Sequence, residues 1–173
     1  MSFKVAIVGP ESTGKTTVFQ YLQSYYKCTT INDYSRKYLS KNGLKYSEKD
    51  ILTMATNHSN LIRNSSYTEL TILDTDLLNY VIWYEVKYNK FDDHLLNLWR
   101  NNQADLYFLL LPTLSWEYDE MRESEFTQDL LVNLHFKYLK ENKCFYYIID
   151  SCCKKRLNKI IFLINHALHL HHC

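Results

Sequence analysis

Short runs of apolar residues alternate with longer amphipathic stretches along this chain. Five runs have strand length and end at turn or polar residues. We expect strands over residues 4–8, 29–31, 70–74, 106–111 and 145–149. The first run ends at Gly9 and has the pattern of a buried strand, and the fourth stops at Pro112.

The stretches between these runs carry apolar residues at helical spacing. Helices are expected over residues 15–26, 33–39, 47–62, 77–88, 126–141 and 157–170. Gly43 is interpreted as a helix C-cap, and Ser47 to Asp50 as a capping segment. Strands alternating with helices predict an α/β fold with a five-stranded, mainly parallel sheet, in one domain over residues 1–173.

The composition is that of a globular protein. Of the 173 residues, 46% are apolar and 23% are charged, and the formal net charge is +1. We therefore expect no general attraction to nucleic acid or to a membrane. The longest clean apolar run has only strand length, and the five cysteines include no CxxC pair. Neither a membrane span nor a zinc site is expected, and a cytoplasmic protein is favoured.

Residues 9–16, Gly-Pro-Glu-Ser-Thr-Gly-Lys-Thr, match the P-loop pattern GxxxxGK[ST] between a strand and a helix. Backbone N–H groups of such a loop form a concave anion site at a helix N-terminus. Lys15 is expected to reach the β- and γ-phosphates, and Thr16 to bind Mg²⁺. The motif predicts a P-loop NTPase three-layer sandwich. The predicted nucleotide-binding residues are Gly9, Glu11, Ser12, Thr13, Gly14, Lys15, Thr16 and Thr17.

Two carboxylates follow the third predicted strand. Asp74 ends that strand, as expected of the acidic partner of a P-loop Mg²⁺ site, so Thr16 and Asp74 are the predicted metal residues. Asp76 has two readings, contact with a substrate hydroxyl or capping of the following helix, and the sequence does not separate them.

Asp33 and Arg36 come just after the second predicted strand. Ligands of open parallel sheets bind outside the carboxyl ends of the strands, so Asp33 is a candidate base and Arg36 a candidate anion ligand. An ordinary surface ion pair at this i,i+3 spacing is the alternative.

A charged segment after Pro112, over about 113–125, is a candidate lid. Phosphoryl transfer needs a cationic group over the phosphates and exclusion of water, and Arg122 is the predicted cation. A solvated charged helix is the alternative.

Taken together and in this order, these segments resemble the NadR-type ribosylnicotinamide kinase domains and related small P-loop ATPases. The loop over 9–17 is similar to the family's Gly-x-Glu-Ser-x-Gly-Lys-Ser/Thr-Thr, and residues 33–38 resemble its Glu-Tyr-x-Arg-x-Tyr. Residues 74–76 match its Asp-Thr-Asp, and 116–122 are similar to its Pro-Trp-x-x-Asp-x-x-Arg. The segment departs from the family at Asp33, where Glu is common, and at Trp116, which no proline precedes directly.

The resemblance implies an ATP- and Mg²⁺-dependent small-molecule kinase that converts nicotinamide riboside to nicotinamide mononucleotide. The implied catalytic residues are Lys15, Asp33, Asp74, Asp76 and Arg122, with Asp33 preferred over Asp76 as the base. A flat cationic ring stacks well on aromatic faces. The implied acceptor-binding residues are Asp33, Tyr34, Arg36, Asp76, Trp83 and Trp116. For the aromatic residues, core packing is the alternative.

Two other functions stay open at this point. A deoxynucleoside or nucleotide kinase would share the P-loop and differ in the acceptor pocket. A nucleotide acceptor needs additional cations for its phosphate, and among the arginines before the candidate lid only Arg36 follows a strand end, so a nucleoside-like acceptor is preferred. A regulatory P-loop ATPase that binds a protein partner would hydrolyse ATP slowly without acceptor specificity. The sequence predicts no oligomeric state.

Overall fold

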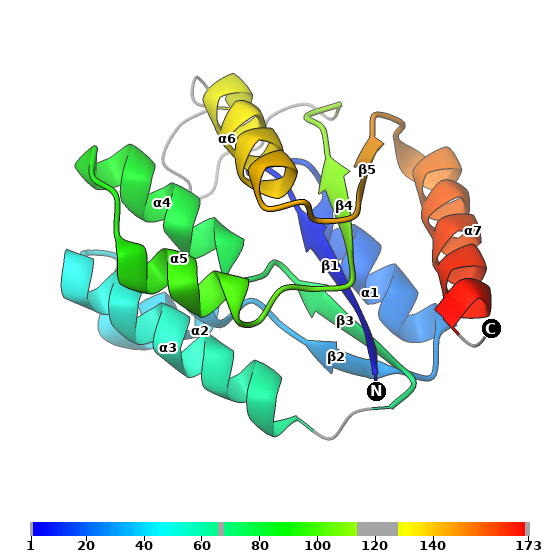
Figure 1. Cartoon of the computed structure of the whole chain (residues 1–173), viewed down its shortest axis with the longest axis horizontal. Coiled ribbons are helices and arrows are strands. Elements are labelled where there is room, and N and C mark those ends of the chain that lie inside the picture. The colour runs from blue at the N-terminus through cyan, green and yellow to red at the C-terminus, as the bar shows by residue number, and fades with distance from the viewer. Residues whose placement is uncertain (1, 66–67, 114–127, 172–173) are drawn as a thin grey trace.

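The predicted α/β architecture is confirmed. The computed structural model describes residues 2–65, 68–113 and 128–171. Its sheet has the order β2-β3-β1-β4-β5, and every strand pair is parallel (Figure 1). The strands are β1 (Phe3–Val8), β2 (Thr29–Ile31), β3 (Leu70–Asp74), β4 (Leu106–Leu110) and β5 (Tyr146–Ile149).

Helices cover both faces of the sheet, as Figure 1 shows. Helices α1 (Lys15–Tyr25) and α7 (Cys153–His171) pack on one face. The helices that pack on the other face are α2 (Tyr34–Asn42), α3 (Glu48–Asn64), α4 (Leu78–Tyr88), α5 (Asp93–Arg100) and α6 (Gln128–Glu141). The described residues therefore form three layers.

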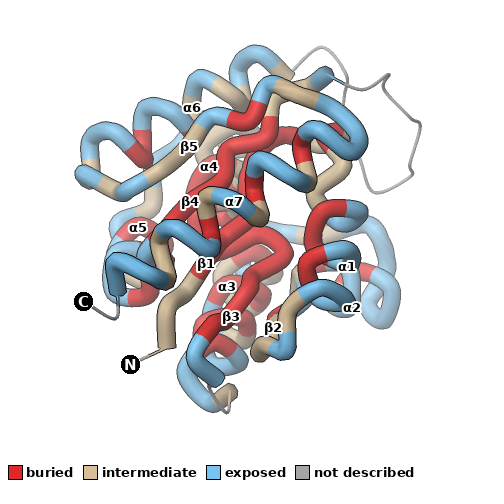
Figure 2. Tube along the Cα trace, turned by 90° about the vertical axis from the view of Figure 1, so that its right-hand side faces the viewer, coloured by how far each residue is buried: buried red, intermediate tan, exposed pale blue. Residues whose placement is uncertain are grey.

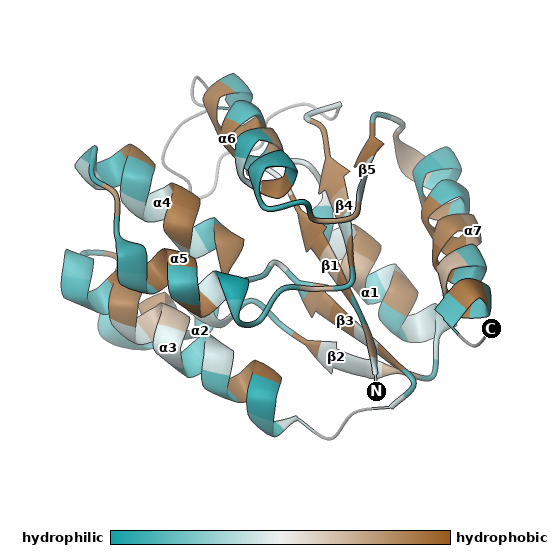
Figure 3. Ribbon diagram, viewed as in Figure 1, coloured by the Kyte–Doolittle hydropathy of each residue, from teal (hydrophilic) through white to brown (hydrophobic). Residues whose placement is uncertain are grey.

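The alternation of side chains along β1 divides the core into two clusters. Val5 and Ile7 join the cluster under α1 and α7, whereas Ala6 and Val8 join the cluster on the other face. All four side chains are fully buried, as are the central strands in Figure 2, and the strands form an apolar centre in Figure 3. A strand buried on both faces is typical of a parallel sheet with helices on either side.

Local capping explains where two helices begin and one ends. The Asp50 carboxylate accepts hydrogen bonds from the backbone N–H (2.8 Å) and hydroxyl (2.6 Å) of Ser47 at the start of α3. Gly43 ends α2 with a φ of 93°, a conformation that favours glycine, so the predicted C-cap is confirmed. Asp33 is the N-cap of α2.

Helix α5 was not predicted from the sequence. Its eight residues bury Leu95, Leu96 and Trp99, and the Asp92 side chain caps it by accepting from the Leu95 N–H at 2.8 Å. The helix α7 begins at Cys153, four residues before the predicted start at Leu157 (157 − 153 = 4). Among the described helices, none combines the length and the hydrophobicity needed to cross a membrane.

The buried His135 of α6 makes a testable contribution to pH-dependent stability. Its side chain is 1% exposed, and burial lowers its pKa to about 4, against an ordinary value of 6.5. The unfolded chain therefore takes up a proton near pH 6.5 before the folded chain does, and stability falls as the pH drops from about 6.5 towards 4. Between pH 8 and pH 5 this loss amounts to about 2 kcal/mol.

We expect the variant His135→Asn to lose less stability than the wild type between these pH values. Asparagine does not titrate, and its amide can replace the ring Nδ1 that lies 2.7 Å from the Leu131 carbonyl oxygen. Urea unfolding of both proteins at pH 8 and pH 5 measures the difference, with the exposed His94→Asn as control. Parallel losses in the wild type and His135→Asn would contradict the assignment.

Candidate active site

The P-loop turns tightly between β1 and α1. Gly9, Ser12 and Gly14 have positive φ values of 136°, 57° and 79°. At Gly9 a side chain is also excluded by packing, because a Cβ would lie 2.5 Å from the backbone oxygen of Leu110. The loop therefore lies directly against the end of β4, and glycine is needed at its first position.

Hydrogen bonds within the loop fix its shape. The Lys15 ammonium donates to the carbonyl oxygens of Gly9 (2.9 Å) and Pro10 (2.6 Å), and the Thr13 hydroxyl donates to Pro10 (2.9 Å). Helix α1 begins at Lys15, and the Val18 N–H closes its first turn onto the Gly14 carbonyl. The first N–H groups of a helix lack partners within it and face the helix N-terminus, which makes this end suited to phosphate.

The predicted metal residues lie together at the carboxyl edge of the sheet. Strands β1 and β3 are neighbours with Ile7 opposite Asp74, so the end of β3 lies beside the loop. The Thr16 hydroxyl lies 3.4 Å from a carboxylate oxygen of Asp74. Mg²⁺ prefers such hard oxygen ligands and usually combines one or two of them with substrate phosphates and water. The pair therefore fits the Mg²⁺ of a bound nucleotide.

The charges around Asp74 connect it to the other predicted site residues. Burial, and after it the charge of Asp33, raises the pKa of Asp74 from its ordinary value of 3.8 to about 6. The charges of Lys15 and Arg36 act in the opposite direction. Three predicted residues from two other segments thus influence the Asp74 carboxylate. A bound cation favours the ionised form of such a group.

Asp33 faces this region from the end of β2. One of its carboxylate oxygens accepts from the backbone N–H (2.9 Å) and the hydroxyl (2.7 Å) of Ser35. The N-cap bonds hold this oxygen at the start of α2 and fix the side chain at the sheet edge. Burial, and after it the charge of Asp33, raises the pKa of Tyr80; burial lowers the pKa of His58, and the charge of Asp33 opposes this shift.

Asp76 corrects the sequence-based assignment. Its side chain is 1% exposed, with one oxygen accepting from the Leu78 N–H (2.9 Å) and the other from Trp99 Nε1 (3.1 Å) and the Tyr107 hydroxyl (2.9 Å). Of the two readings, capping at the start of α4 is the one observed. The direct contact with substrate is not supported, because protein donors already occupy both oxygens within the core.

Two of the predicted acceptor-stacking residues, Trp83 and Tyr34, lie among the described residues. Trp83 packs edge-on against Tyr46, with ring centroids 4.7 Å apart, and its Nε1 donates to the Tyr46 hydroxyl at 2.7 Å. Trp83 therefore packs within the core, as the alternative reading of this residue predicted. Tyr34 is half-buried and its hydroxyl accepts from the Asn57 amide at 3.3 Å. Trp116 and Arg122 lie outside the described residues, as does nearly all of the predicted lid.

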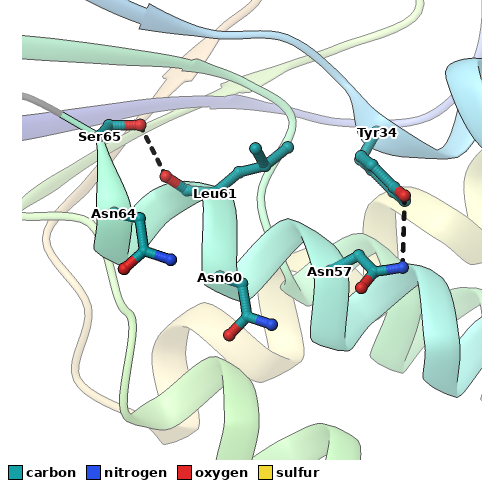
Figure 4. Close-up of a pocket in the computed structure, with 6 residues that line it drawn as sticks. All are labelled: Tyr34, Asn57, Asn60, Leu61, Asn64 and Ser65. Atoms are coloured by element: carbon teal, nitrogen blue, oxygen red, sulfur yellow. Dashed lines mark hydrogen bonds between the residues drawn. The ribbon is translucent and has the colours of Figure 1, made fainter.

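A pocket of about 320 Å³ lies along α3 (Figure 4). Of the described residues that were predicted to bind the acceptor, Tyr34 alone lines it. The remaining lining residues come from α3 and its end, namely Asn57, Asn60, Leu61, Asn64 and Ser65. This pocket therefore does not coincide with the residues predicted to carry the chemistry.

A family of sequences described as an AAA domain matches residues 4–151. The chain belongs to this AAA-domain family. The match covers the P-loop, Asp33 and Asp74, and it extends to the end of β5. No match was found among curated protein sequences.

Solved structures share the fold of this AAA-domain chain at low sequence identity. The NadR protein in complex with NR is 18% identical with a TM-score of 0.80, over 95% of this chain and 50% of the NadR chain. A deoxyadenosine kinase from M. mycoides is 18% identical with a TM-score of 0.68, over 95% of this chain and 100% of its own. The YorR protein from Bacillus subtilis, in complex with phosphorylated GDP, is 18% identical with a TM-score of 0.60, over 96% and 98%. The NadR-like P-loop fold predicted from the motifs is confirmed.

Two side chains that the sequence analysis did not select contact the loop of this AAA-domain chain. Arg156 of α7 donates to the Thr13 carbonyl, and Gln128 of α6 donates to the Glu11 carbonyl at 2.9 Å. Arg156 stands in a basic run that resembles an exposed surface. Its spacing of four and eight residues from the buried Ile160 and Ile164 is the signal that places it on the inner face of α7 (160 − 156 = 4, 164 − 156 = 8).

Proposed function

We propose that this protein is an ATP-dependent kinase that phosphorylates a small nucleoside, with nicotinamide riboside as the acceptor. The observation that carries the proposal is the 3.4 Å approach of the Thr16 hydroxyl to the Asp74 carboxylate beside a complete P-loop. A third side chain, Asp33, lies near enough to influence the pKa of Asp74. A phosphate site, a pair of oxygen ligands for a metal ion and a carboxylate base are the parts that phosphoryl transfer requires.

The P-loop residues hold the donor in this proposal. Backbone N–H groups of the loop and the Lys15 ammonium bind the β- and γ-phosphates of ATP. Thr16 and Asp74 would hold Mg²⁺, which neutralises phosphate charge when it is bound. Asp33 accepts the proton of the acceptor hydroxyl. The hydroxyl oxygen attacks the γ-phosphorus at the same time, and the bond between the γ-phosphorus and ADP breaks. Positioning and charge neutralisation supply most of the rate enhancement.

Three observations support the choice of acceptor. The segments over 33–38 and 74–76 resemble those of ribosylnicotinamide kinases. The NadR structure, solved in complex with NR, has the highest TM-score of the three solved structures described above. Tyr34 adjoins Asp33 at the start of α2 and offers an aromatic face to a cationic ring.

A deoxynucleoside kinase is the second candidate. The deoxyadenosine kinase is matched over 100% of its own chain, whereas this chain spans only half of the NadR chain. A neutral nucleoside would use the same loop, Asp74 and Asp33. The two candidates therefore differ in the acceptor and not in the donor chemistry.

An acceptor screen tests the proposal. Purified protein is incubated with Mg²⁺-ATP and single nucleosides, including nicotinamide riboside, deoxyadenosine, thymidine and uridine. ADP release is measured, and phosphorylated product is detected by mass. Formation of nicotinamide mononucleotide is the expected result. ATP hydrolysis without any phosphorylated nucleoside would overturn the kinase proposal and favour a regulatory ATPase.

A further inference from the structure

Four side chains donate hydrogen bonds to carbonyl groups of the P-loop. Two of these donors, Lys15 and Thr13, belong to the loop itself. Two others, Gln128 and Arg156, come from helices that follow the loop by more than a hundred residues in the sequence. These two helices pack on opposite faces of the sheet, so the loop is held from both sides.

Arg156 is built into this position. Its side chain is 2% exposed, and burial lowers its pKa. Besides the bond to Thr13, the guanidinium donates to the Ser151 carbonyl (2.5 Å), the Thr113 hydroxyl (2.7 Å) and the Leu111 carbonyl (3.4 Å). A planar group with five N–H donors can serve such divergent acceptors, and a lysine cannot. Arg156 therefore links the P-loop to the two segments that follow β4 and β5.

The peptide geometry connects these bonds to phosphate binding. In a trans peptide unit, the carbonyl of one residue and the N–H of the next point in opposite directions. A bond that fixes the Thr13 carbonyl therefore fixes the Gly14 N–H, and a bond that fixes the Glu11 carbonyl fixes the Ser12 N–H. Both N–H groups belong to the segment that forms the anion site of a P-loop.

We infer that Arg156 and Gln128 are positioning residues of the phosphate site, which hold two loop carbonyls outward and thereby keep the Ser12 and Gly14 N–H groups turned towards the phosphates. The inference rests on the nucleotide binding contained in the proposed function. It does not depend on which acceptor is phosphorylated. Neither side chain touches the phosphates in this arrangement, because each acts through the backbone of the loop.

Binding of two ligands tests the inference. Mg²⁺-ATP and inorganic tripolyphosphate are titrated calorimetrically into the wild type, Gln128→Ala and Arg156→Lys, well below each unfolding temperature. We expect affinity to fall about 3- to 10-fold for Gln128→Ala and about 10- to 100-fold for Arg156→Lys. Both ligands should lose affinity by the same factor, since tripolyphosphate has no nucleoside and reports on the phosphate site alone.

Neighbouring exposed residues supply matched controls. Asp129→Asn on α6 and Lys155→Met on α7 change exposed positions of the same helices next to Gln128 and Arg156, and wild-type affinity is expected for both. A purely structural role predicts a different result, a lower unfolding temperature with affinities within about twofold of the wild type, and that result would overturn the inference. If Arg156→Lys does not fold, Gln128→Ala decides by the same criterion.

The titrations separate this inference from the proposed function. If no nucleoside is phosphorylated but the variants lose affinity for both ligands, the positioning role stands and the kinase proposal fails. If the wild type binds neither ligand, both fail.

Discussion

Lys15→Ala is expected to abolish phosphoryl transfer while the fold survives. The ammonium is the strongest positive charge of the loop, and its removal leaves the developing charge on the γ-phosphoryl group without its main partner. Loss of a single electrostatic donor typically lowers kcat by about 10²- to 10³-fold, and a full charge should exceed this range. Turnover with the best acceptor and the far-UV circular dichroism spectrum are measured on the same preparation.

The structure adds a stability cost to this prediction. Lys15 also donates to the Gly9 and Pro10 carbonyls, so the variant loses two bonds that shape the loop. Lys27→Ala, at an exposed lysine just beyond α1, is the matched control and should retain wild-type turnover. Near-normal turnover in a folded Lys15→Ala protein would remove the P-loop from the mechanism.

Asp33→Asn is expected to lower the transfer rate strongly and leave ATP affinity nearly unchanged. General-base catalysis contributes about 10²- to 10⁴-fold, and the amide cannot accept the proton. Asparagine keeps one carbonyl oxygen that can accept from the Ser35 N–H and hydroxyl, so the start of α2 should be preserved. Single-turnover rates and calorimetric ATP titrations give the two quantities.

A second capping carboxylate provides the control for this variant. Asp50 holds the start of α3 as Asp33 holds the start of α2, and its other oxygen accepts from the Tyr38 hydroxyl at 2.7 Å. Asp50→Asn should therefore reduce stability without reducing the transfer rate. Equal rate losses in both variants would mean that Asp33 acts through helix capping, and a base would have to be sought elsewhere.

Much of the fold could be predicted because the sequence patterns that specify its strands and the P-loop are local. Each strand is a short apolar run with a clear end, and the P-loop motif fixes the connection between β1 and α1. The meeting of Thr16 and Asp74 follows from two facts, a parallel sheet and polar residues at strand ends. Such residues converge at one edge whatever the detailed order of the strands.

The roles of Asp76 and Arg156 could not be predicted from the sequence, because each role depends on packing against distant segments. Asp76 carries the same sequence signal as Asp74, yet Trp99 and Tyr107 enclose it in the core. Arg156 lies in a basic run and is nonetheless buried, because α7 turns that position towards the loop. The contacts that decide both cases join segments at least 23 residues apart, beyond the reach of local patterns.

Helix α5 illustrates the limit for short elements. Its apolar stripe of Leu95, Leu96 and Trp99 was present in the sequence, together with a capping aspartate at 92. Only two turns are available to establish a helical period, so the stripe was not distinguished from a loop. Trp99 is fully buried, in contact with Tyr138 of α6, Tyr107 of β4 and Asp76, and all of these partners lie outside α5.

A comparison of acceptor specificity tests most directly whether nicotinamide riboside is the acceptor. The value of kcat/KM is measured for nicotinamide riboside, deoxyadenosine, thymidine, deoxycytidine and uridine under one set of conditions with saturating Mg²⁺-ATP. A cation on an aromatic face gains roughly 0.5–2 kcal/mol, so we predict that nicotinamide riboside is preferred by about 2- to 30-fold over the neutral nucleosides. A higher kcat/KM for deoxyadenosine or for a neutral pyrimidine nucleoside would contradict the account and assign the protein to the deoxynucleoside kinases.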